Sequence, residues 1–92
     1  MDDYLALSVQ YYKTHRFEES IAACEQALKI QPELAEAYSN EAASYYVLGK
    51  DEQAIHALRE AIRIRPDMDI AKQNLAFLLS EQSKLAKQAA PH

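Results

Sequence analysis

The chain has 92 residues and a formal net charge of −4, with 10 lysines and arginines against 14 aspartates and glutamates. This length suffices for one small domain and not for two. The acidic balance argues against a nucleic-acid partner, because phosphate binding needs clustered positive charge. The single cysteine excludes an internal disulfide framework, and no apolar run approaches the length of a membrane span.

Sixteen alanines, against nine valines, isoleucines and threonines together, favour helices over a β-sheet. The acidic start, Met1–Tyr4, is not followed by an apolar run, so we expect no signal peptide. The expected location is the cytoplasm, unless the chain is a part cut from a larger protein.

Residues 1–34 predict two helices. Tyr4, Leu7 and Tyr11 recur at helical spacing until residues 14–16 break the pattern, where His15 must adopt a left-handed backbone to end the helix. A second helix follows, and its apolar face consists of Phe17, Ile21, Cys24 and Leu28.

Residues 35–68 repeat this arrangement. The break between the two helices falls at residues 48–50, where Gly49 can take the left-handed conformation easily. Pro32 and Pro66 follow the second helix of each unit and end it. Residues 69–88 predict one last helix, and residues 89–92 a frayed tail.

The two units are 34 residues long and share nine identities in register. The identical pairs are Tyr4/Tyr38, Tyr11/Tyr45, Tyr12/Tyr46, Glu18/Glu52, Ile21/Ile55, Ala23/Ala57, Ala27/Ala61, Ile30/Ile64 and Pro32/Pro66. The spacing of these aromatic, small and proline residues resembles the tetratricopeptide repeat, a 34-residue helix–turn–helix unit.

The resemblance implies an all-α fold: a right-handed α-solenoid of antiparallel helix hairpins with five helices. Its expected parts are repeat 1 at residues 1–34, repeat 2 at residues 35–68, and a capping helix at residues 69–88. Two positions depart from the family pattern. Glu41 stands where leucine is usual, and we expect it at an edge, reaching water or pairing with a base. Lys72 replaces a large aromatic residue, as fits a terminal helix with one polar side.

Such repeats usually form protein-interaction modules, so the resemblance implies an adaptor or scaffold that binds a peptide in the concave groove lined by the first helix of each unit. Residues on the free face of these helices are candidates for the groove: Leu5, Val9, Tyr12, Lys13, Asn40, Ala43, Tyr46, Val47, Asn74 and Phe77. Groove asparagines can donate to and accept from a peptide backbone whatever its sequence. We expect a partner with apolar or aromatic side chains and a basic residue facing Asp2 or Glu36.

No catalytic pattern is present, and we expect neither enzymatic activity nor a cofactor or metal. His15, His56 and His92 have no metal-ligand spacing. Cys24 aligns with a packing position, which predicts a buried, inert thiol of raised pKa. The arginines near residues 59–65 complement the dipole of their helix, or else form a convex patch for an acidic partner.

Two alternatives remain open. Leu78 and Leu85 lie seven residues apart on the last helix, on the side where a missing helix would dock, which predicts self-association and a homo-oligomer. The chain could also be an accessory domain of a larger enzyme, such as a glycosyltransferase or methyltransferase, with the activity elsewhere.

Overall fold

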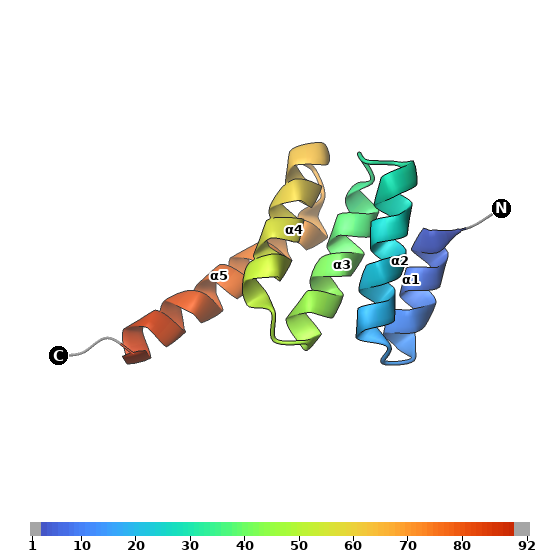
Figure 1. Cartoon of the computed structure of the whole chain (residues 1–92). Helices are drawn as coiled ribbons and strands as arrows, with labels where there is room; N and C mark the ends of the chain where they lie inside the picture. The colour runs from blue at the N-terminus through green and yellow to red at the C-terminus, as the bar shows by residue number, and fades with distance from the viewer. Residues whose placement is uncertain (1–2, 90–92) are drawn as a thin grey trace.

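The computed structural model describes the backbone of residues 3–89 and the side chains of residues 3–85, and this part of the chain is all-α. Five helices follow one another with short turns between them (Figure 1). They are α1 (Tyr4–Lys13), α2 (Phe17–Ile30), α3 (Ala35–Val47), α4 (Asp51–Ile64) and α5 (Asp69–Ala89). The prediction of five helices is therefore confirmed. Of the predicted frayed tail, residues 90–92 lie outside the described residues.

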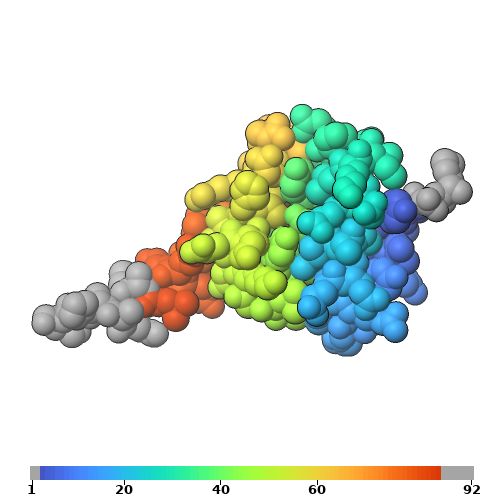
Figure 2. Space-filling model, in the orientation of Figure 1, coloured from blue at the N-terminus to red at the C-terminus, as the bar shows by residue number. Residues whose placement is uncertain are grey.

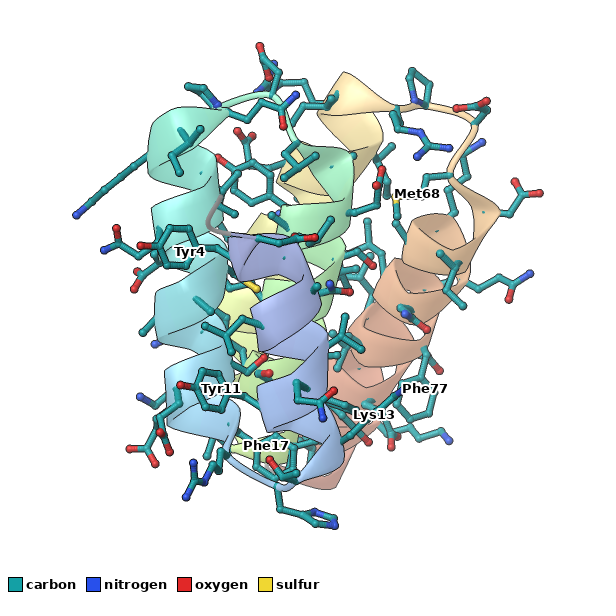
Figure 3. The ribbon with its side chains drawn as sticks, turned by 90° about the vertical axis from the view of Figure 1, so that its right-hand side faces the viewer. Tyr4, Tyr11, Lys13, Phe17, Met68 and Phe77 are labelled. Carbon is teal, nitrogen blue, oxygen red and sulfur yellow. The ribbon has the colours of Figure 1, made fainter. Side chains whose placement is uncertain are left out.

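The helices form two hairpins, α1/α2 and α3/α4, which stack side by side with α5 at the end of the row (Figure 1). Each helix packs against the next along the chain, and α1 also contacts α3. Viewed from the N-terminal end, α2 lies on one side of the molecule and α5 on the other (Figure 3). The molecule is elongated, with extents of 57 × 28 × 18 Å, as expected for a solenoid.

The turns inside the two hairpins have the same backbone geometry. His15 has φ of 62° and Gly49 has φ of 77°, so both occupy the left-handed region. In each turn the following residue closes the helix end: the Arg16 N–H donates to the Tyr11 carbonyl, and the Lys50 N–H to the Tyr45 carbonyl, both at 2.8 Å. The prediction that His15 adopts the left-handed conformation, as Gly49 does in the second hairpin, is confirmed.

The core is built mainly from small residues, which let the helices approach closely. Its largest continuous part joins α3, α4 and α5 and consists of Ala35, Ala42, Ala54, Ile55, Ala57, Leu58, Ala61, Ala71 and Leu78. Between the first hairpin and α3, Cys24 is fully buried, and burial is the largest cause that raises the pKa of its thiol to about 11. The prediction of a buried thiol of raised pKa is confirmed, and its lack of reactivity stays a prediction.

Helix α5 corrects the expectation about Leu78. This residue is only 3% exposed and belongs to the core with α4, so its side chain cannot form the contact between two copies that the spacing predicted. The seven-residue spacing does place Ala71, Leu78 and Leu85 near one face, but that face points toward the body of the molecule. Leu85 is 60% exposed because α5 runs on past the α3/α4 hairpin, as the space-filling view shows (Figure 2).

Candidate functional site

A pocket of about 320 Å³ lies where four helices meet, on the side of the molecule opposite α2. Its lining residues are Tyr12, Ala42, Ala43, Tyr46, Leu58, Asn74, Phe77 and Leu78. Five of the ten predicted groove residues are among them: Tyr12, Ala43, Tyr46, Asn74 and Phe77. Leu58 and Leu78 line its base as buried apolar residues. The sequence did not predict this role, because its pattern marks Leu58 as a helix-packing position and assigns Leu78 to self-association.

Aromatic side chains dominate the walls of this pocket. Tyr46 of α3 and Phe77 of α5 meet edge to face, with their ring centroids 5.8 Å apart and their planes at 75°. Both rings remain about half exposed, at 43% and 50%, and Tyr12 of α1 is 39% exposed. Tyr12 in turn lies edge to face against Phe17, 5.4 Å away, which supports its ring from behind. The pocket thus presents three exposed aromatic rings held from neighbouring helices.

The two predicted asparagines have different environments. Asn74 is exposed and lines the pocket. Asn40 is half-buried, and its side-chain nitrogen lies 3.5 Å from Ser8 Oγ, a long hydrogen bond between α3 and α1. Ser8 Oγ itself donates to the Leu5 carbonyl at 2.6 Å. Asn74 is therefore the asparagine that the structure brings to the pocket, while Asn40 contributes to the contact between α1 and α3.

The other predicted groove residues lie outside this pocket. Leu5 is half-buried and lines a smaller pocket of about 180 Å³ near the start of α1. Val9, Lys13 and Val47 are exposed. Lys13 lies at the end of α1, on the same side of the molecule as Phe77 (Figure 3).

The acidic residues expected to face a basic partner are not both available. Glu36 forms an ion pair with Arg65, with Oε1 and Nη1 2.8 Å apart, and Asp2 lies outside the described residues. Arg63 likewise contacts Glu33 at 3.1 Å and Glu60 at 3.2 Å. Two of the arginines predicted to complement a helix end or to form a basic patch are thus paired with carboxylates near the turn between the repeats.

Glu41 also departs from expectation, because it is only 8% exposed and lies between α2 and α4 rather than at an edge. Burial is the main cause that raises the pKa of its carboxyl to about 7, and the nearby charge of Glu25 adds to the effect. The predicted partner base is absent among the described residues, where Glu41 forms no ion pair. The signal for this burial was the leucine that is usual at this position in the family pattern, because leucine there marks a packing position.

Within the part of the chain that the structure describes, no group of three or more histidine, cysteine, aspartate or glutamate side chains could hold a metal ion. No helix of this part combines the length and the apolar character needed to cross a bilayer. The absence of a cofactor and of catalysis stays a prediction.

Two comparisons bear on the family. Models of the tetratricopeptide repeat match residues 2–34 and residues 35–68. These segments contain α1 to α4, and α5 lies beyond both matches. A search of curated proteins finds no match to the chain.

Proposed function

Because the chain belongs to the tetratricopeptide repeat family, whose repeats generally form protein–protein interaction modules, we propose that it binds a peptide segment of a partner protein in the pocket between α1, α3 and α5. The family's repeats are typically not catalytic, and the proposal assigns no chemical step to these 92 residues.

The observation that carries the proposal is the cluster of exposed aromatic rings around one pocket. Tyr12, Tyr46 and Phe77 keep between 39% and 50% of their surface accessible although a packed core lies beside them. Aromatic residues at the centre of a concave apolar patch are typical of interaction sites, since a partner can bury them at a low cost in side-chain entropy. We infer that the peptide inserts an apolar or aromatic side chain here.

Asn74 supplies the polar part of the recognition. Its amide can donate to a peptide carbonyl and accept from a peptide N–H at the same time. Its position on the pocket wall supports a role in aligning the peptide backbone, while the rings select the side chain.

The test begins with a random peptide library from which binders to the wild-type protein are selected. Their affinity is then measured by fluorescence polarisation for wild type and for a Tyr46→Ala, Phe77→Ala double variant. We expect affinity to fall at least about tenfold, because two central aromatic contacts are lost. Glu18→Ala on α2 is the matched control and should leave affinity unchanged. Equal binding by the double variant, with unchanged helical circular dichroism, would contradict the proposal.

A second candidate function is self-association through α5. Leu79 and Leu85 on this helix are 39% and 60% exposed, so both are accessible to a second copy of the chain. Leu78, which the sequence paired with Leu85, is buried and takes no part in this candidate contact. Sedimentation equilibrium over rising protein concentration tests it. A dimer that Leu85→Lys abolishes would support it, and a constant monomer mass would exclude it.

A further inference from the structure

A third pocket, of about 290 Å³, shares no lining residue with the aromatic pocket formed around Tyr12, Tyr46 and Phe77. It lies between α3 and α4 and is lined by Glu41, Tyr45, Glu52, Gln53 and His56. Glu52, Gln53 and His56 belong to the first half of α4 and are exposed. Helix α4, labelled in Figure 1, faces the viewer in the same orientation in Figure 2. At this size, the pocket is at the small end for ligand sites and fits one side chain rather than a larger molecule.

Glu41 is the unusual member of this pocket. This residue is only 8% exposed yet lines the cavity, and its side chain forms no hydrogen bond or ion pair with any described residue. A carboxylate that is largely buried and has no protein partner is costly, because it keeps only part of the water that would solvate it. A cation entering the cavity would supply the missing partner.

The surroundings of Glu41 increase its attraction for a positive charge. Glu25 of α2 is close enough to disfavour the charged form of Glu41, and Glu52 adds a second carboxylate to the pocket wall. The ion pairs among the described residues all involve other acids. The carboxylates of Glu25, Glu41 and Glu52 therefore give this pocket a negative potential, and none of them forms an ion pair with a described lysine or arginine.

We propose that this pocket binds the guanidinium group of an arginine side chain from a partner protein. Guanidinium carries five N–H donors in one plane, which suits a carboxylate and several further acceptors around it. Glu41 and Glu52 accept from it, and the Gln53 amide oxygen is a further acceptor. The Tyr45 ring provides a face on which the planar cation stacks. An ammonium ion lacks both the planarity and the fork of donors.

The proposal concerns the α3/α4 side of the molecule and does not depend on the peptide pocket. A peptide that uses the aromatic pocket could fail to bind while the arginine site is intact, and the reverse also holds. The two proposals can therefore fail separately.

The test uses N-acetyl-arginine methylamide as the probe, with ¹H–¹⁵N NMR spectra of the intact protein. We expect saturable shifts centred on the amides of Tyr45, Gln53 and His56. Binding should be up to about thirtyfold tighter at pH 8 than at pH 5.5, because Glu41 with a pKa of about 7 is mostly protonated at the lower pH. Shifts reproduced by sodium chloride at equal ionic strength would overturn the proposal.

Two variants and a second probe complete the design. Glu41→Gln keeps the shape of the side chain and should abolish saturable binding, whereas Glu18→Ala on α2, outside the pocket, should retain both binding and its dependence on pH. Retention of binding in Glu41→Gln, or loss of the pH dependence in Glu18→Ala, would contradict the assignment to Glu41. Binding of N-acetyl-lysine methylamide as tight as that of the arginine probe would overturn the assignment to arginine.

Discussion

Among single residues, His15 and Gly49 adopt the left-handed backbone conformation that ends the first helix of each hairpin. Gly49 has φ of 77°, and a Cβ atom added there would meet nothing within 4 Å. Any cost of a side chain at this position therefore comes from the backbone and not from a steric clash. His15 tolerates the same conformation in the first repeat, with φ of 62°.

We expect Gly49→Ala to lower the free energy of unfolding by about 1 kcal/mol, because alanine resists a positive φ. Gly49→Asn should lose less, since asparagine adopts the left-handed region more readily. Urea denaturation followed by circular dichroism measures both. Equal losses in the two variants would show that the backbone conformation is not the cause.

Glu41 makes stability depend on pH. Its folded pKa of about 7 lies above the ordinary value of 4.5 for a glutamate, so between these values the folded state holds a proton that the unfolded state has released. Stability should therefore fall as pH rises through this window, by up to about 3 kcal/mol. Thermal denaturation between pH 5 and pH 8 measures the effect.

Glu41→Leu provides the control for this prediction, since it removes the titrating group and restores the residue usual in the family pattern. The variant should lose the pH dependence and be more stable than wild type at pH 8, because no buried charge remains. A pH profile parallel to that of wild type would assign the dependence to another group.

For the helix as an element, α5 shows what periodicity can and cannot predict. The spacing of Ala71, Leu78 and Leu85 indicates which side chains share a face of a helix. The direction in which that face points depends on the rotation of α5 about its own axis relative to α4. The sequence spacing carries no information about this rotation. The turns inside the two hairpins and the ends of α2 and α4 were accessible from the sequence, because the glycine and proline signals there are local.

We expect Leu78→Ala to cost about 2–5 kcal/mol of unfolding free energy, because it leaves a cavity in the core. Leu85→Ala, at an exposed site on the same helix, should change stability by no more than about 0.5 kcal/mol. Chemical denaturation of the two variants compares them directly. Similar losses would mean that α5 is packed along its whole length.

On the scale of the whole molecule, the 34-residue period predicted the stacking of the hairpins and the side on which the aromatic pocket lies. It predicted the lining of the aromatic pocket only in part, since five of the ten expected groove residues lie there. Asn40 turned out to pack toward Ser8, and Glu36 to pair with Arg65, because these contacts join residues 32 and 29 positions apart. Such contacts depend on the exact superhelical arrangement, which the pattern of one repeat does not determine.

Since α5 completes both the core and the aromatic pocket, binding of a peptide there should stabilise the entire fold. For a ligand at ten times its dissociation constant, mass action gives about 1.4 kcal/mol, or about 6–11 °C in Tm for a domain of this size. Differential scanning fluorimetry with a selected peptide tests this. An unchanged Tm at saturation would mean that the peptide binds folded and unfolded chains equally.

The packing of each helix on its neighbours along the chain also has a consequence for how the protein folds. Contacts between sequence neighbours close short loops, so little chain entropy is lost before each contact forms. Helical proteins with such local contacts fold within microseconds to milliseconds. Either hairpin can therefore serve as the nucleus on which the remaining helices assemble.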